Sequence, residues 1–134
     1  MSFTSTSSRY GNDDIPDSDE PNNFIAPFWD DLYVGDGQAV YYFRDNTNHR
    51  FYIEYANVRR YSGAGNYNLQ VVLYENGDID LVYGPLTELI DECTIGIENS
   101  SGTEGMKLYY DGSSGVLGGW DPRSGSSVRF TRRE

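Results

Sequence analysis

Residues 67–84 read YNLQVVLYENGDIDLVYG, two runs of β-branched and aromatic residues on either side of Asn76-Gly77. An Asn-Gly pair between two such runs is typical of a β-hairpin, because both residues tolerate the positive φ angles of a tight turn. The stretch therefore predicts two antiparallel strands joined by a short loop.

The register of this hairpin depends on the length of its loop. A two-residue turn would place Leu73 opposite Asp80, whereas a three-residue loop that ends with Gly77 in the left-handed conformation places Leu73 opposite Ile79. We favour the second register because it gathers six apolar side chains on one face of the hairpin. That face would carry Leu69, Val71, Leu73, Ile79, Leu81 and Tyr83.

The same alternation appears elsewhere in the chain. In RFYIEYANV, residues 50–58, Phe51, Ile53 and Tyr55 recur with a period of two, which is typical of a half-buried strand. Further strands are predicted in AVYYFRD (39–45), CTIGIEN (93–99), KLYYD (107–111) and SVRFTRR (127–133), after an apolar entry at 24–29. About seven to eight short strands separated by turn residues predict an all-β fold, an antiparallel two-layer β-sandwich that is jelly-roll-like.

The length of 134 residues fits one domain. Residues 2–23 are polar, acidic and interrupted by Pro16 and Pro21, so they bring too little apolar surface to become ordered on their own. We interpret residues 1–22 as a polar acidic N-terminal arm or linker, with a short edge strand around residues 3–6. Residues 23–134 would form a single β-sandwich domain.

The charge of the chain limits its partners. The formal net charge is -11, from 21 acidic and 10 basic residues. Such a surface repels phosphate groups, so nucleic acid and anionic membranes are not expected as partners. No stretch approaches the roughly 18 consecutive apolar residues of a membrane helix, so no membrane span is predicted.

Five segments follow one another along the chain: FIAPFWDDL (24–32), VYYF (40–43), RFYIEYANV (50–58), NLQVVLYENGDIDLVYG (68–84) and CTIGIENSSG (93–102). Together they resemble the nidogen-like extracellular module and the related β-sandwich modules of secreted bacterial surface proteins and peptidases. The resemblance covers about residues 23–112. It implies an extracellular or cell-surface adhesion or accessory module without an established catalytic role. The acidic leader at 11–20 and the Gly-Ser-rich segment at 112–127 lie outside this pattern, so the resemblance supports no function there.

Aromatic residues are more numerous than one core of this size readily buries, since Tyr alone occurs 12 times. Alternation along strands sends them to both faces, so several should be exposed, where they bind sugar rings or proteins at low entropic cost. The alternative is that they pair across strands and only cover the sheet. We predict an extracellular protein or glycan as the partner. The predicted ligand contacts are Trp29, Tyr61, Tyr110 and Trp120.

The acidic leader contains the hard oxygen ligands that Ca²⁺ prefers, in Asp13, Asp14, Asp17 and Asp19. Their spacing lacks the central Gly and the distal Glu of an EF-hand loop. We therefore expect a solvated acidic arm, with a Ca²⁺ site at these four residues as the alternative.

The sequence contains no convincing set of catalytic residues. Asp30-Asp31 beside an aromatic residue could belong to a sugar-cleaving site, but adjacent residues in an extended segment point to opposite faces. We expect these carboxylates to accept backbone hydrogen bonds at a turn. His49 lacks a Gly-x-Ser-x-Gly partner motif and is predicted to be a solvated turn residue, and Cys93 is predicted to be a small buried hydrophobic residue. The chain is therefore not expected to be an enzyme.

The residues leave three classes of function, of which the first two are favoured. The first is a non-catalytic binding or adhesion module of a larger secreted or surface protein. The second is a self-assembling subunit of a filament or surface layer, a homo-oligomer in which the N-terminal arm adds a strand to the exposed edge of a neighbour. A glycoside hydrolase or peptidase that uses Asp30 and Asp31 is the third class.

Overall fold

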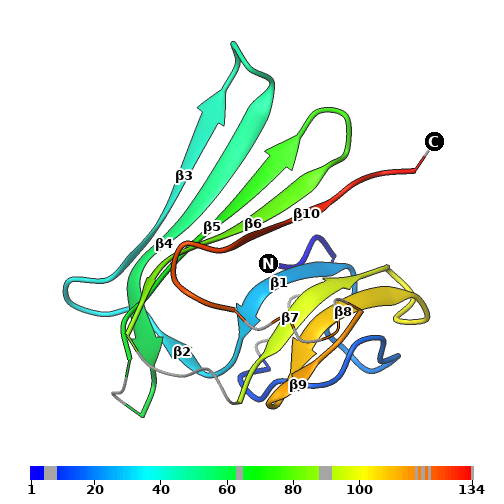
Figure 1. The fold of residues 1–134 in the computed structure, drawn as a ribbon, viewed down its shortest axis with the longest axis horizontal. Coiled ribbons are helices and arrows are strands. Elements are labelled where there is room, and N and C mark those ends of the chain that lie inside the picture. Colours follow the sequence, from blue (N-terminus) through cyan, green and yellow to red (C-terminus); the bar gives the residue numbers. More distant parts are fainter. Residues whose placement is uncertain are drawn as a thin grey trace. The chain divides into compact units, whose positions relative to one another are not determined.

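The computed structural model describes residues 1–4, 9–62, 65–87, 92–116, 118, 120 and 122–133. Within these ranges the chain forms ten β-strands and no helix (Figure 1). The predicted class, an all-β chain made of antiparallel sheets, is confirmed: there are two sheets, and eight of the ten strands have four residues or more. In the ranges that the structure describes, no helix is long and apolar enough to cross a membrane.

The contacts divide the chain into two compact units. Unit 1 comprises residues 1–32 and 90–122, and unit 2 comprises residues 33–89 and 123–134. Neither unit is continuous in sequence. Strands that are distant along the chain are therefore neighbours within each unit.

Unit 1 contains a four-stranded sheet. Its order is β1 (Phe24–Trp29), β7 (Thr94–Glu98), β8 (Gly105–Tyr110) and β9 (Ser113–Ser114). Ile25 pairs with Ile97, and Ile95 pairs with Tyr109, so apolar side chains gather on one face. Cys93, which precedes β7, is fully buried, as predicted.

The acidic segment 9–22 covers the other face of this sheet. Ile15 is only 2% exposed and clusters with Phe24 and Ala26. Its side chain lies so close to the backbone at Gly96 and Gly105 that a Cβ at either glycine would be within 3.1 Å of an Ile15 methyl group. The part of the chain predicted to be a solvated arm thus supplies an interior residue of unit 1.

Polar contacts fix the same segment over the sheet. The Asp17 N–H donates to Glu98 Oε2 at 2.8 Å, and Lys107 Nζ donates to Asp14 Oδ1 at 2.6 Å. The Thr94 hydroxyl donates to the carbonyl oxygen of Asp13 at 2.5 Å. These bonds join residues more than 80 positions apart, so they form only when the sheet is assembled.

The first three residues pair with the free edge of β1. Met1 and Ile25 exchange two backbone hydrogen bonds of 2.8 Å, and the Phe3 N–H donates to the carbonyl oxygen of Asn23 at 2.9 Å. Ser2 forms a β-bridge with Phe24. A short edge strand was predicted around residues 3–6, and the described part of this pairing begins two residues earlier.

Unit 2 is built on the larger sheet. Its order is β10 (Ser127–Phe130), β6 (Ile79–Leu86), β5 (Tyr67–Tyr74), β4 (Arg50–Arg60) and β2 (Leu32–Tyr33), while β3 (Ala39–Asp45) also pairs with β4. In the described residues β3 has no strand on its other side, and Figure 1 shows it at the outer edge of the sheet.

The β5–β6 hairpin has the predicted register. Leu73 pairs with Ile79, and Val71 pairs with Leu81. The loop between Tyr74 and Asp78 has three residues, and Gly77 at its end has a φ of 90°. Both the loop length and the left-handed glycine are confirmed.

The register gives this sheet two distinct faces. One face, called the buried face, carries Phe51, Ile53, Tyr55, Leu69, Val71, Leu73, Ile79, Leu81, Tyr83, Val128 and Phe130. The opposite face, called the open face, carries Tyr41, Phe43, Arg50, Tyr52, Glu54, Asn68, Gln70, Tyr74, Asp80, Val82 and Arg129. Aromatic, amide and charged groups are thus gathered on one side of unit 2.

Candidate functional site

A single cross-strand row runs over the open face from β3 to β6. Tyr41 pairs with Glu54, Glu54 with Gln70, and Gln70 with Val82. Directly paired residues in antiparallel strands point to the same face, so these side chains stand next to one another. The Tyr41 side chain is 59% exposed. The row therefore combines an exposed aromatic ring with a carboxylate and an amide.

A hollow of about 480 Å³ opens beside this row. It is lined by Glu54, Asn57, Asn68, Leu69, Gln70, Val82, Gly84 and Pro85. Among the residues that the structure describes, neither the Glu54 carboxylate nor the Gln70 side-chain amide has a hydrogen bond or an ion pair. Both groups are available to a molecule that enters the hollow.

Asn68 on β5 fixes the shape of the hollow by bridging its two neighbouring strands. Its Oδ1 accepts a hydrogen bond of 3.0 Å from the N–H of Asn57 on β4. Its Nδ2 donates to the carbonyl oxygen of Pro85 on β6 at 3.3 Å. Asn57 has a φ of 55° and lies in the bulge where the β4–β5 register shifts, and Asn tolerates this conformation better than most residues.

Gly84 lines the hollow and leaves space there because it has no side chain. A Cβ at this position would lie 3.2 Å from Asn68 Cβ and 3.3 Å from the Asn68 carbonyl oxygen. These contacts are tighter than ordinary van der Waals separations, so a larger residue would push the Asn68 bridge out of place. The glycine thus permits β5 and β6 to approach closely at this point.

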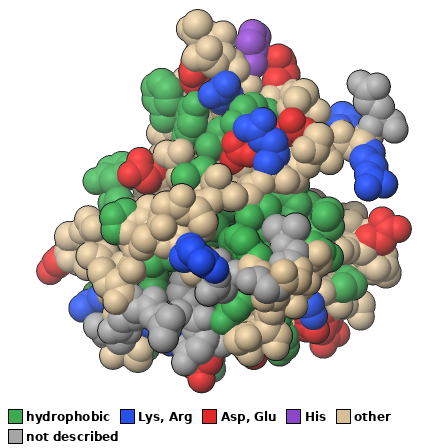
Figure 2. Space-filling model, in the orientation of Figure 1, with side chains coloured by type: hydrophobic (Ala, Val, Ile, Leu, Met, Phe, Trp, Pro, Cys, Tyr) green, Lys and Arg blue, Asp and Glu red, His purple; other side chains and the backbone are tan. Residues whose placement is uncertain are grey.

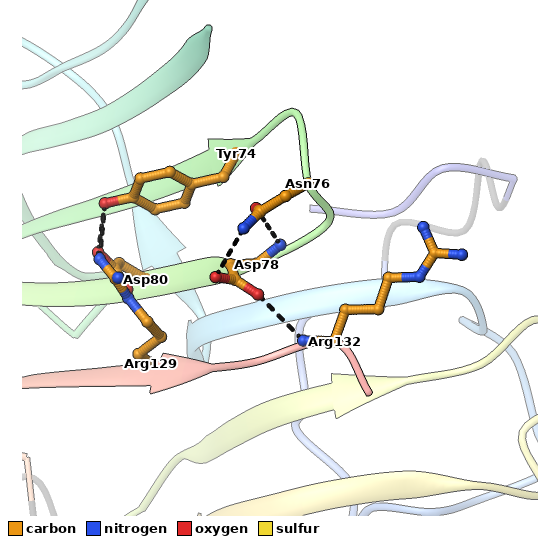
Figure 3. A network of polar contacts seen from close by, with 6 residues as sticks. All are labelled: Tyr74, Asn76, Asp78, Asp80, Arg129 and Arg132. Carbon is orange, nitrogen blue, oxygen red and sulfur yellow. Dashed lines mark hydrogen bonds and ion pairs between the residues drawn. The ribbon is translucent and has the colours of Figure 1, made fainter. Parts of the chain in front are cut away.

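A polar network joins β5, β6 and β10 on the open face, but none of its residues lines this hollow; Figure 3 shows Tyr74, Asp80 and Arg129 of this network from close by. Arg129 Nε donates to Asp80 Oδ1 at 2.6 Å, and Arg129 Nη2 donates to Asp80 Oδ2 at 2.7 Å. The Tyr74 hydroxyl donates to Asp80 Oδ2 at 2.7 Å and accepts from Arg129 Nη2 at 2.9 Å. The guanidinium groups of Arg129 and Arg50 lie 4.8 and 5.0 Å from the centre of the Tyr74 ring.

The groups in this network shift one another's pKa values. The hydrogen bonds from Arg129 and Tyr74 lower the pKa of Asp80 below its ordinary value, with Arg129 as the largest cause. The hydrogen bond to Asp80 raises the pKa of the Tyr74 hydroxyl. The Asp80 carboxylate and the Tyr74 hydroxyl are thus already engaged, and their hydrogen bonds tie β5, β6 and β10 together.

A second hollow of about 270 Å³ lies at the loop between β3 and β4. Its acidic groups are engaged in the loop itself. Asp45 accepts a hydrogen bond of 2.7 Å from the Asn48 side chain, which is the largest cause of its lowered pKa. Glu75 pairs with His49 Nδ1 at 3.0 Å. We therefore regard the first hollow as the candidate site.

The comparisons with known proteins concern the whole chain. A family model described as NIDO related matches residues 1–132. The chain belongs to this nidogen-related family. Comparisons with the curated proteins and with the solved structures found no match. The family indicates an extracellular module and is not a known enzyme family.

Membership of the NIDO related family confirms the resemblance and changes its extent. We expected the resemblance to cover about residues 23–112, whereas the match covers residues 1–132. The acidic leader at 11–20 and the segment at 112–127 are therefore parts of the family pattern. The contacts of residues 9–22 with unit 1 give a physical reason, because this segment covers one face of the β1–β7–β8 sheet.

The structure does not bring the four predicted ligand residues of this NIDO related chain together in one unit. Trp29, Tyr110 and Trp120 belong to unit 1, and Tyr61 belongs to unit 2. Trp29 is half-buried and packs edge-on against Phe24 at 5.2 Å, while Tyr110 is half-buried under the Lys107 ammonium group at 5.5 Å. Tyr61 is 71% exposed. Ligand binding by these four residues remains a prediction.

The acidic residues of the leader have separate partners. Asp13 pairs with Arg9 at 2.5 Å, Asp14 pairs with Lys107, and Asp17 Oδ1 accepts from the Asp19 N–H at 2.8 Å. No group of three or more His, Cys, Asp or Glu residues that could hold a metal ion is found in the described part of the chain. Binding of Ca²⁺ by Asp13, Asp14, Asp17 and Asp19 stays a prediction.

The two other sequence interpretations agree with the geometry. Asp30 Oδ1 accepts the Asp31 N–H at 2.7 Å, which is the turn role expected for this pair. His49 is exposed and has a φ of 55°, as suits a turn residue.

The number of aromatic residues predicted exposed rings, but the sequence did not single out Glu54, Gln70, Asn57 and Asn68. The signal was present in part, since Glu54 alternates with the apolar residues of β4, and Asn68 and Gln70 alternate with those of β5. Only the register between the strands shows that these polar residues share one row.

Proposed function

We propose that this chain is a non-catalytic binding module of a larger extracellular or cell-surface protein, and that the open face of unit 2 holds its ligand. The observation that carries the proposal is the hollow of about 480 Å³ in which unengaged Glu54 and Gln70 groups adjoin the exposed ring of Tyr41. The nidogen-related family supports the extracellular setting.

A carbohydrate ring suits this arrangement. Sugar hydroxyls both donate and accept hydrogen bonds, so they can satisfy a carboxylate and an amide together. An aromatic side chain such as Tyr41 offers an apolar face and a polar tip to the same ring. The hollow is open, and apolar residues such as Val82 and Pro85 line it together with the Glu54 and Gln70 polar groups, which suits a saccharide better than a deeply enclosed apolar ligand. A protein that inserts a polar side chain is the other ligand class, and the experiment below separates the two.

The hollow does not support hydrolysis of the sugar that it would hold. Glycoside hydrolysis generally uses two carboxyl groups roughly 5–9.5 Å apart on either side of the bond that breaks. Glu54 is the single acidic residue among the described residues that line the hollow. We therefore propose binding without catalysis.

A glycan and cell-surface protein array, probed with and without a chelator, tests this function. We expect binding to glycans that the chelator does not remove. For the best ligand, Glu54→Gln should raise the Kd by about tenfold or more and Tyr41→Ala by about fivefold, because a hydrogen bond to a charged group contributes about 1.5–3 kcal/mol and an aromatic contact about 1 kcal/mol.

Tyr10→Ala is the matched control, because Tyr10 is 72% exposed and belongs to unit 1. This control should keep the wild-type Kd. If binding is lost in Tyr61→Ala or Trp120→Ala but not in Glu54→Gln, the site is not the open face. Loss of binding in the presence of the chelator would instead indicate a calcium-dependent site in the acidic leader. If the chain binds proteins on the array but no glycan, the ligand is a protein.

Self-assembly through the N-terminal residues is a second candidate. The pairing of Met1–Phe3 with β1 shows that this edge accepts an added strand. The same pairing between two copies would be a strand exchange. Deletion of residues 1–4 tests it without disturbing Ile15, and oligomers that disappear on deletion would support it.

A further inference from the structure

We infer that β3 is a homodimerisation strand, which pairs antiparallel with β3 of a second copy to join the two unit 2 sheets into one. Among the strands that the structure describes, β3 is the one with an outward edge that is both long and regular. Its seven residues, Ala39–Asp45, pair with β4 without any shift of register, and no described residue hydrogen bonds to the opposite edge. Alternate residues of such a strand direct their N–H and C=O groups outward, as a template for another strand.

β3 lacks the features by which proteins usually protect an edge. Edge strands are commonly blocked by Pro, by Lys, by a bulge or by very short length. AVYYFRD contains neither Pro nor Lys, and its charged residues, Arg44 and Asp45, are confined to one end. The centre of the strand is instead apolar and aromatic.

The side chains of β3 are exposed on both faces of the sheet. Tyr41 and Phe43 on the open face are 59% and 62% exposed, and Tyr42 on the opposite face is 78% exposed. Figure 2 shows hydrophobic side chains at the surface in the region of β3. Aromatic side chains present roughly 150–250 Å² each, so these exposed fractions leave roughly 300–500 Å² of ring surface on each copy. Two copies together present roughly 600–1,000 Å², which is the size of a weak, transient interface.

The strand register and the charges of β3 favour a second copy of the chain as the partner at this edge. An antiparallel pair of β3 strands centred on Tyr42 uses all seven residues. It places Tyr41 opposite Phe43 and Arg44 opposite Val40, so no like charges face one another. Arg44 is then diagonal to Tyr42 of the second copy, within reach of its ring.

The distribution of charge removes the main obstacle to self-association. Unit 1 contains thirteen acidic and two basic residues, whereas unit 2 contains eight of each. The whole net charge of -11 therefore belongs to unit 1, and unit 2 is formally neutral. Two copies can approach through unit 2 without the repulsion that a highly charged edge would impose.

Sedimentation equilibrium of the full chain tests the proposal. We expect the average mass to rise from monomer toward dimer between about 10 µM and 1 mM, as suits an interface of this small size. Tyr42→Lys, which would place two ammonium groups opposite each other, should be monomeric at 1 mM or at least tenfold weaker in association. Tyr10→Lys, an equally exposed position in unit 1, should associate like the wild type.

A cross-linking experiment tests the register and does not depend on the stability of the Tyr42→Lys variant. Directly opposite residues have Cα atoms about 4.5–5.5 Å apart, which is within the range of a disulfide. The one native cysteine, Cys93, is buried. Under mild oxidation Tyr42→Cys should therefore form a covalent dimer, and Tyr10→Cys should not.

Several results would overturn the inference. They are a wild type that is monomeric at 1 mM, a dimer that persists unchanged in Tyr42→Lys, and equal cross-linking of both cysteine variants. A dimer that disappears when residues 1–4 are deleted would assign association to the β1 edge instead. The proposed ligand site is tested separately, because Tyr42 lies on the face opposite Glu54 and Gln70.

Discussion

At the scale of single residues, Asp80 carries the clearest electrostatic signature. Its carboxylate accepts two hydrogen bonds from Arg129 and one from Tyr74. These bonds favour the ionised form, so the pKa of Asp80 in the folded chain lies below its ordinary value of 3.8. A carboxyl group with a lowered pKa stabilises the fold above its unfolded pKa, and this contribution is lost as the pH falls through the folded value.

Asp80→Asn should therefore lower the stability of unit 2 at pH 7, and its difference from the wild type should shrink as the pH falls below about 3.8. Urea unfolding of both proteins at pH 7, 5, 4 and 3 measures this. Asp36→Asn is the control, because the Asp36 carboxylate has no hydrogen bond or ion pair among the described residues. A constant difference at every pH would show that the amide disturbs packing and that the Asp80–Arg129 ion pair contributes nothing.

At the scale of elements, the acidic segment 9–22 behaves as part of the unit 1 core. Ile15→Ala should cost about 2–4 kcal/mol of unfolding free energy, because Ile15 is 2% exposed and the backbone at Gly96 and Gly105 closes around it. Urea unfolding followed by tryptophan fluorescence reports this, since Trp29 packs against the same cluster.

Val116→Ala provides the comparison for this prediction. Val116 also belongs to unit 1 but is 58% exposed, so its truncation should change the unfolding free energy by less than about 0.5 kcal/mol. An equally small effect for Ile15→Ala would mean that the segment contributes little to the stability of unit 1.

Local signals were enough to predict the β5–β6 hairpin but not this segment. The alternation of apolar residues and the Asn76-Gly77 pair act within 18 residues, and they determined both strands and their register. Segment 9–22 has one large aliphatic residue, Ile15, and depends on partners more than 80 positions away. Composition therefore indicated a solvated arm, whereas the assembled sheet supplies what the segment lacks.

The sequence predicted the types of residue in the candidate site but not their arrangement. Exposed aromatic residues follow from their number, but that number does not show which of them are exposed. The row from Tyr41 through Glu54 to Gln70 depends on two strand registers and on the bulge at Asn57, where the chain departs from a period of two. Sequence alone also could not show how exposed each ring is, and the ring of Trp29, one of the predicted ligand contacts, is half-buried against Phe24.

At the scale of the whole molecule, the charge is divided unequally between the two units. An acidic side chain in unit 1 lies in the negative field of twelve other acidic residues, whereas one in unit 2 lies among equal numbers of both signs. Repulsion between like charges destabilises a compact state and is screened within about 10 Å at 0.1 M salt. The same substitution should therefore have different effects in the two units.

Glu104→Gln in unit 1 should raise the urea concentration at the midpoint of unfolding in low salt, and Asp36→Asn in unit 2 should leave it nearly unchanged. Both side chains are exposed and neither carboxylate has a partner among the described residues, so each substitution removes a charge and no contact. In 0.5 M NaCl the gain from Glu104→Gln should largely disappear, because screening removes the repulsion that the substitution relieves. A gain that is equal for the two variants, or that persists in high salt, would show that the excess of acidic residues does not act on unit 1 as a whole.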